Sequence, residues 1–361
     1  MLFTYSPRAL AENWLNQAIT QILSDGMRRI IDGHKVVAWP GAIPENIRPH
    51  LKSRSGVRKR LEKFWKEFAA LNLATQEILL EALSQQSNLP DALFNNSTCF
   101  EIDRFPANIR DAAVDLFRFL FEEQLTAIKI NGKSLRDTHY AVIYEECPSR
   151  ICPFCGLGHF RAPGAPRHAL DHYMPITRYP FAGADFRNLP PMCSECNSDF
   201  KKNVDILRDK RGRRRRCIDP YNGPVVKVSL LKSLPFSGAV KNGIRLPKWR
   251  IQLKCASQRE AENWDRIFKV RERYERDVLD AEFRSWLEHF ARWYVRGKHG
   301  GEGGDEIAAA IPVYINTVIQ DDFADMAFLK SEVFRMLSKE CINYRRGGDM
   351  KAFLEILVAS V

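Results

Sequence analysis

The chain has 361 residues, of which 45% are hydrophobic and 27% are charged, and its net charge is +11. This length exceeds what one compact core usually holds, so two or three domains are expected. No apolar run approaches the roughly 18 residues that a membrane span needs, and the N-terminal "MLFTYSPRAL" is unlike a secretory signal, so a cytoplasmic protein without a membrane partner is expected.

The positive charge is concentrated in two stretches. Residues 48–66 carry eight Lys or Arg and one Glu, and residues 201–216 carry nine Lys or Arg and two Asp. Each stretch therefore has a net charge of +7, and the rest of the chain is slightly acidic. Such concentration indicates a polyanionic partner. For residues 48–66 an alternative stays open, which is a solvated helix face.

The first 137 residues have the pattern of an all-helical region. Apolar residues recur at three- and four-residue steps over 8–23, and the segments 56–84 and 106–130 also have helical periodicity. Pro106 suits a first helical turn, and Asn131-Gly132 suits a helix stop.

From about residue 138 the pattern changes. "HYAVIYEEC" is β-like, and the next sixty residues are rich in Pro, Gly and Cys. Residues 223–257 predict a small antiparallel sheet, because "VVKVSL" and "WRIQLK" alternate and "AVKNGIRL" contains an Asn-Gly hairpin turn. A helical pattern returns at 258, is interrupted by "GKHGGEGG", and continues around 323–343 and 349–359.

Together these elements predict an α+β fold, in which mainly helical flanks surround a small central core followed by a short antiparallel β segment. The core is the part richest in cysteine and histidine. The expected regions are an N-terminal helical region 1–137, a central core 138–222, a β segment 223–257 and a C-terminal helical region 258–361.

Four of the nine cysteines form two Cys-x-x-Cys pairs, Cys152 with Cys155 and Cys193 with Cys196. The pairs are 37 residues apart, and each can place two thiolates on one tetrahedral Zn²⁺. A site filled by four thiolates has no position for water, so this zinc is expected to be structural. The arrangement fits a reducing cytosol. The other cysteines have no ligand spacing and are expected to be buried apolar residues: Cys99, Cys147, Cys217, Cys255 and Cys341.

Between and after the pairs lie several polar residues in a fixed order. Asp171 and His172 are adjacent in "HALDHYMPI", which has the pattern of a strand, so they are expected on opposite faces. Asn188 follows in "FRNLPPM". The stretch "CSECNSDFKK" predicts a helix start with Ser194 as its cap and Asn197 in its first turns.

This ordered set resembles the HNH endonuclease family. The matching stretches are "LDHYMPI", "NLPPMCSECN" and "NSDFK", with "HYAVIY" as a lead-in and "IDPY" after them. The resemblance covers about residues 138–222. It implies a ββα-metal core, in which a β-hairpin and one helix hold a divalent cation.

The resemblance also implies roles for single residues. His172 resembles the general base that takes a proton from the attacking water, and Asn188 resembles the residue that fixes the loop and orients the histidine. Asp171 resembles a metal ligand. The family often has His where this chain has Asn197, and the pair Asp171 and Asn197 implies Mg²⁺ or Mn²⁺ on oxygen ligands.

Basic residues after the core are expected to hold the flanking phosphate backbone without reading sequence. Two follow the second cysteine pair directly, and the others belong to the Arg-rich run. They are Lys201, Lys202, Arg208, Arg211, Arg213, Arg214, Arg215 and Arg216.

The function expected from this resemblance is a metal-dependent HNH endonuclease acting on DNA rather than RNA. One such site cuts one strand, so a nick is expected. By analogy with free-standing members of the family, the chain is expected to serve bacterial defence against phage. Two alternatives stay open: a non-catalytic zinc module that binds nucleic acid, and a scaffold whose helical flanks dock a protein partner.

Overall fold

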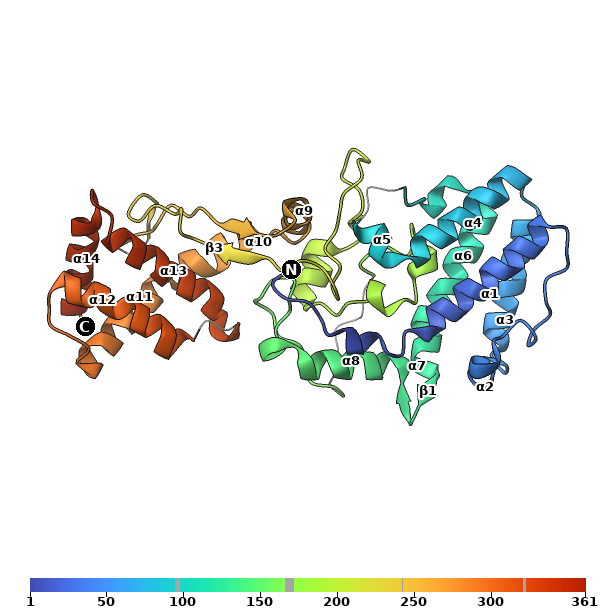
Figure 1. Ribbon diagram of the computed structural model, residues 1–361, viewed down its shortest axis with the longest axis horizontal. Helices are drawn as coiled ribbons and strands as arrows, with labels where there is room; N and C mark the ends of the chain where they lie inside the picture. The colour runs from blue at the N-terminus through green and yellow to red at the C-terminus, as the bar shows by residue number, and fades with distance from the viewer. Residues whose placement is uncertain (95–97, 166–171, 242, 321–322) are drawn as a thin grey trace. The chain divides into compact units, whose positions relative to one another are not determined.

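The computed structural model describes residues 1–94, 98–165, 172–241, 243–320 and 323–361. Helices dominate, and the described strands form three two-stranded antiparallel sheets, so the α+β prediction is confirmed at this level (Figure 1). The chain divides into two compact units. The N-terminal unit comprises Met1, Phe3–Phe154 and Gly158–Pro224, and the C-terminal unit comprises Leu2, Cys155–Leu157 and Val225–Val361.

The N-terminal unit is built on four long helices. They are α1 (Trp14–Ile31), α3 (Ser55–Ala69), α4 (Leu73–Ser87) and α6 (Ala107–Phe119), with the short helices α2 (Arg48–Leu51), α5 (Leu89–Phe94) and α7 (Leu125–Ala127) between and after them. Helix α3 packs against α6, and α1 packs against α4. The predicted segment 56–84 is two helices, because the Asn72 side chain accepts a hydrogen bond from the Thr75 N–H at 2.9 Å and starts α4.

The helix predicted over 106–130 is confirmed in most of its length. Pro106 lies immediately before α6, and a π-helical turn at residues 120–124 leads into α7. Asn131 and Gly132 both have positive φ and form the turn between β1 (Lys129–Ile130) and β2 (Lys133–Ser134).

The β-like prediction for "HYAVIYEEC" is wrong, because this stretch belongs to helix α8 (Leu135–Glu146). Ser134 caps the helix by accepting a hydrogen bond from the Asp137 N–H at 3.0 Å. His139 and Ile143 are buried one turn apart on the same side of the helix. The cap and the buried face outweigh the strand preference of the aromatic and β-branched residues.

Of the predicted strand 168–176, residues 168–171 lie outside the described residues, and the described remainder is not a strand. His172–Ile176 have no strand pairing, and in the described part of 138–222 the pairings outside helices are isolated bridges such as Ile151 with His159. The β-hairpin that the resemblance implies is therefore not present as regular strands among these residues. The segment is held by side-chain packing. The Phe181 ring packs edge-on to those of Phe64 and Phe117, at 6.2 Å and 5.6 Å between ring centroids.

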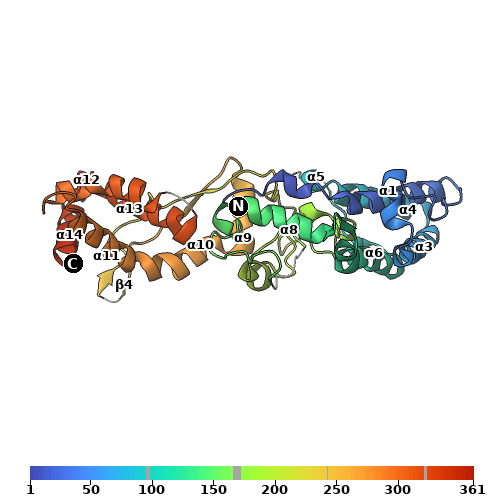
Figure 2. The ribbon, with the colours of Figure 1, turned by 90° about the horizontal axis from the view of Figure 1, so that it is seen from below.

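The segment predicted as one small antiparallel sheet forms two separate two-stranded sheets at the start of the C-terminal unit. Strand β3 (Lys227–Ser229) pairs with β6 (Gln252–Lys254), and β4 (Val240–Lys241) pairs with β5 (Ile244–Arg245), both antiparallel. The α-helices that follow in the described residues are α9 (Gln258–Phe268), α10 (Val270–Arg273), α11 (Asp280–Gly297), α12 (Gly304–Tyr314), α13 (Ala327–Cys341) and α14 (Gly347–Ala359). Figure 2 shows α12 alongside α13, against which it packs.

Helix α12 was not predicted, since Pro312 interrupts its pattern and a Gly-rich break precedes it. The predicted break at 297–304 is confirmed, because α11 ends at Gly297 and α12 begins at Gly304. Among the described residues, no helix combines the length and apolar character that crossing a bilayer requires.

Phe181→Ala is expected to lower the free energy of unfolding by about 3–5 kcal/mol, because it empties an aromatic site in the helical core. Urea denaturation followed by circular dichroism measures the loss. Ile78→Ala on α4, where the side chain is 44% exposed, is the control and is expected to change it by less than about 0.5 kcal/mol. Equal losses in the two variants would contradict the packing of this segment into the core.

Candidate functional site

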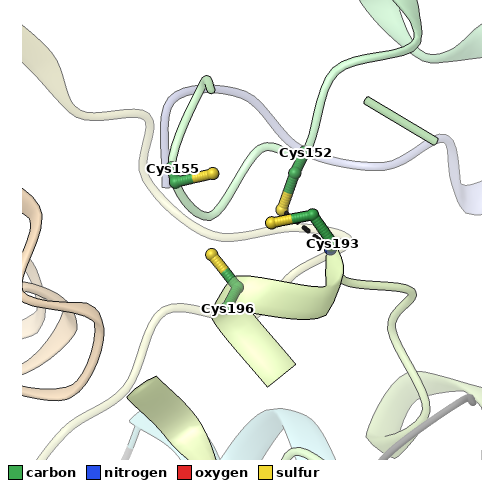
Figure 3. A group of neighbouring side chains, drawn as sticks. All are labelled: Cys152, Cys155, Cys193 and Cys196. Carbon is green, nitrogen blue, oxygen red and sulfur yellow. Dashed lines mark hydrogen bonds between the residues drawn. The ribbon is translucent and has the colours of Figure 1, made fainter. Parts of the chain in front are cut away.

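The four paired cysteines form one cluster, as predicted. All four are buried, and their Sγ atoms lie within 4.8 Å of one another. Figure 3 shows the four sulfur atoms pointing into a common space. Four thiolates at about 2.3 Å from a tetrahedral Zn²⁺ stand roughly 3.8 Å apart, so the cluster fits a zinc-like ion.

The backbone around the first cysteine pair is shaped for this cluster. The Cys152 N–H donates to the Gly158 carbonyl at 2.8 Å, and Ile151 pairs with His159 just outside the loop. The Cys193 N–H donates to the Cys152 Sγ at 3.4 Å. A Cβ on Gly158 would lie 2.5 Å from the Cys193 Cβ, so only glycine allows this approach. The sequence analysis did not single out Gly158.

The second cysteine pair leads into a short π-helix, η8 (Glu195–Lys201), where the Asn197 N–H donates to the Cys193 carbonyl at 3.0 Å. The predicted helix is confirmed, but Ser194 is not its side-chain cap, because Ser194 already has helical backbone angles and makes no cap hydrogen bond. Lys201 is only 1% exposed, and its Nζ donates to the Lys202 carbonyl at 3.0 Å. Its ammonium therefore lies in the interior rather than at the surface.

His172 is buried, with 6% of its surface exposed, and its ring has two identified neighbours. Its Nε2 lies 2.8 Å from the Gly183 carbonyl oxygen, and its ring centroid lies 4.4 Å from that of Phe121. A carbonyl oxygen only accepts, so Nε2 carries the proton. In the neutral ring Nδ1 is then the basic nitrogen. Neither Gly183 nor Phe121 was predicted to take part.

Asn188 fixes the chain immediately after His172. Its Oδ1 accepts from the Met174 N–H at 2.7 Å, and its Nδ2 donates to the carbonyls of Met174 at 3.2 Å and Ala182 at 3.1 Å. Its own carbonyl accepts from the Tyr173 N–H at 2.8 Å. Asn188 is 1% exposed, so these bonds satisfy polar groups that water does not reach.

Helix α1 holds the loop that carries the Gly183 carbonyl. Asn16 donates from Nδ2 to the Phe181 carbonyl at 3.0 Å and accepts from the Ala184 N–H at 3.1 Å. Asn13 accepts from the Phe186 N–H at 2.7 Å. These amides were not predicted as site residues, because nothing in their helical periodicity marks them.

The stretches "HYAVIY" and "IDPY" meet in the interior. The Tyr221 hydroxyl lies 3.2 Å from the His139 Nε2, and the His139 ring stacks on Phe186 at 4.3 Å between centroids. Burial lowers the pKa of His139 to about 4, so this ring is neutral at physiological pH. Asp219 is 1% exposed and forms an ion pair with Arg187.

Several arginines of the Arg-rich run contact the protein itself. Arg214 and Arg216 donate to the carbonyls of Ala92 and Phe94 at the C-terminal end of α5, a position where helix dipoles favour cations. Arg208 pairs with Glu101.

The Asp209 carboxylate forms ion pairs with two further arginines. Its Oδ2 lies 2.8 Å from the Nε of Arg213 and 2.6 Å from a terminal guanidinium nitrogen of Arg215. The most exposed members of the predicted set are Lys202, Arg211 and Arg213. These three side chains are exposed to solvent, whereas Lys201 is buried and the other members are half-buried.

The structure thus brings the four cysteines together and joins Asn188 to the chain beside His172. Asp171 lies outside the described residues, and Asn197 is half-buried on η8. Comparisons with models of known protein families, with curated proteins and with solved structures found no match for this chain. The interpretation of the site therefore rests on its own geometry and chemistry.

The cluster predicts about one tightly held zinc ion per chain after dialysis, measured by plasma mass spectrometry. Cys193→Ser is expected to lower the zinc content and the thermal midpoint together. Cys255→Ser, at a half-buried cysteine outside the cluster, is the matched control and should change neither. A wild-type protein that holds no zinc would contradict the assignment.

Asn188→Ala is expected to lower the free energy of unfolding by about 1–3 kcal/mol, because it leaves buried backbone groups of residues 174 and 182 without partners. Asn203→Ala, at an exposed position after η8, is the control and should be nearly neutral. Chemical denaturation of both variants measures the difference. If the two losses are equal, the Asn188 cross-link contributes nothing to stability.

Proposed function

We propose that this chain is a metal-dependent HNH endonuclease that hydrolyses phosphodiester bonds in DNA, with His172 as its general base. The observation that carries the proposal is the buried His172, whose Nε2 donates to the Gly183 carbonyl while Asn188 fixes the adjoining chain. Burial of an imidazole costs free energy unless its polar atoms are bonded, and the bond to the Gly183 carbonyl offsets that cost at Nε2.

His172 is suited to take a proton from water. The Gly183 carbonyl holds the tautomer in which Nδ1 has the lone pair, and the contact with Phe121 holds the ring plane. A fixed base loses less entropy on reaching its reactive geometry. When Nδ1 takes the proton, the Nε2–H bond to the carbonyl is kept, and the carbonyl dipole stabilises the imidazolium.

Asp171 and Asn197 would hold the divalent cation, Mg²⁺ or Mn²⁺, which supplies charge neutralisation at the scissile phosphate when bound. Lys202, Arg211 and Arg213 would hold the flanking backbone by charge, without reading sequence. The net charge of +11 favours encounter with a polyanion. The family resemblance adds four further parts to this proposal. The substrate is DNA rather than RNA, and the product is a nick rather than a double-strand cut. The chain serves in defence and acts with a protein partner. We also propose a cytoplasmic location, because free thiolates such as those of the cluster persist in a reducing compartment.

A second candidate is a zinc-containing module that binds nucleic acid without cleaving it. The observation that favours it is the cysteine cluster, since four thiolates leave a zinc ion no open position for catalysis. Binding alone would survive removal of Mg²⁺, whereas cleavage would not.

The test is cleavage of supercoiled plasmid by zinc-loaded protein freed of other metals, with Mg²⁺ or Mn²⁺ then added. Wild type should produce nicked circles only with the added metal, and His172→Ala should be about 10²–10⁴-fold slower. His159→Ala is the matched control, because His159 is an exposed histidine beside the same cluster, and it should keep full activity.

Zinc content and circular dichroism establish that each variant is folded. Equal cleavage by wild type and His172→Ala would remove the proposed base. A plasmid that is shifted on a gel but never cut, with any metal, would support the binding module instead.

A further inference from the structure

A basic groove lies on one face of the C-terminal unit. It encloses about 600 Å³, and its lining residues come from α11, from the chain just after that helix and from the turn after α12. They are His289, Arg292, Trp293, Arg296, Gly297, His299 and Val318. The α11 members recur at three- and four-residue steps, so they share one helix face. Within the described part of the chain, no carboxylate lines the groove.

The charge of the groove comes from its two arginines. Arg296 is exposed, and no ion pair of Arg296 exists among the described residues. Arg292 lies 3.7 Å from Glu288, which is closer to Arg284 at 2.7 Å. Exposed pairs at such distances stabilise little, so Arg292 keeps most of its capacity to bind an anion.

The neighbouring histidine does not add a charge at neutral pH. Burial and the positive charges of Lys330 and Arg292 lower the pKa of His289, whose Nδ1 lies 2.6 Å from the Tyr314 hydroxyl. The proximity of Lys330 nevertheless makes the surroundings of the groove more positive.

An aromatic surface adjoins the two arginines. The Trp293 ring stacks on His299 at 3.8 Å between centroids and 20° between planes. Trp293 also contacts Tyr314 and Phe290, at 5.1 Å and 5.9 Å, and these contacts fix it to the core. The exposed imidazole of His299 therefore offers a flat face supported from below.

We propose that this groove binds single-stranded nucleic acid, with phosphates on Arg292 and Arg296 and a base stacked on the Trp293–His299 pair. Guanidinium groups bind phosphate through paired hydrogen bonds, and flat rings accept any base. The two arginines stand about 6 Å apart along the helix, a separation that suits neighbouring phosphates of one strand. The groove is open, so a strand can pass through it. The binding is a property of the C-terminal unit and holds whether or not the N-terminal unit cleaves DNA.

The test is fluorescence anisotropy with a labelled oligothymidylate of twelve nucleotides and the full zinc-loaded chain without Mg²⁺, so that cleavage does not enter. Every protein carries Arg211→Ala and Arg213→Ala, which removes the two exposed arginines of the Arg-rich run from the comparison. The groove variant adds Arg292→Ala and Arg296→Ala. The control adds Arg259→Ala and Arg276→Ala, two exposed arginines outside the groove, so both variants lose the same charge.

The groove variant should bind about tenfold more weakly, and its dependence of log K on log salt should be shallower by about 1.4. The control should keep the affinity of its parent within about twofold, and His299→Ala should weaken binding about tenfold without changing the salt dependence. Equal affinities in the groove and control variants would overturn the proposal. Competition by thymidine monophosphate as strong as by oligothymidylate, at equal nucleotide concentration, would overturn the assignment to a strand.

Discussion

Four buried sulfur atoms within 4.8 Å of one another are the constraint on which the central segment depends. Thiolates this close repel one another unless a cation lies among them. The described chain between the two cysteine pairs has little regular structure, so backbone pairing alone holds it weakly. A metal bound by the four cysteines would tie together the two ends of this segment and would limit the positions that His172 and Asn188 can adopt.

The N-terminal helical region contacts the segment that carries His172 and Asn188. Asn13, just before α1, and Asn16 on α1 bind the backbone of the loop that carries the Gly183 carbonyl, and Phe121 contacts the His172 ring. The region predicted as a helical flank and, apart from residues 155–157, the region predicted as the core therefore belong to one compact unit. These contacts position the Gly183 carbonyl and the His172 ring, which the proposed general base requires.

The features that the sequence predicted are those with local causes. The spacing of a cysteine pair is set by the ion that both thiolates bind, and the periodicity of a helix is set by its one buried face. Both patterns lie within a few neighbouring residues, so the sequence predicted the cluster and most helices. Residues 138–146 were not, because a Ser134 cap overrode their strand propensity. The partners of His172 come from residues 121 and 183, and no local pattern encodes such contacts. The internal contacts of Arg214 and Arg216 were hidden for the same reason.

The central claim is that the cysteine cluster supports a separate hydrolytic centre at His172. Its most direct test is a crystal structure of the His172→Ala protein with a short DNA duplex and Mn²⁺, with anomalous maps recorded at the zinc and manganese edges. The account predicts zinc among the four cysteines and manganese between Asp171, Asn197 and a phosphate facing position 172. DNA bound elsewhere, with no manganese at Asp171 and Asn197, would contradict it.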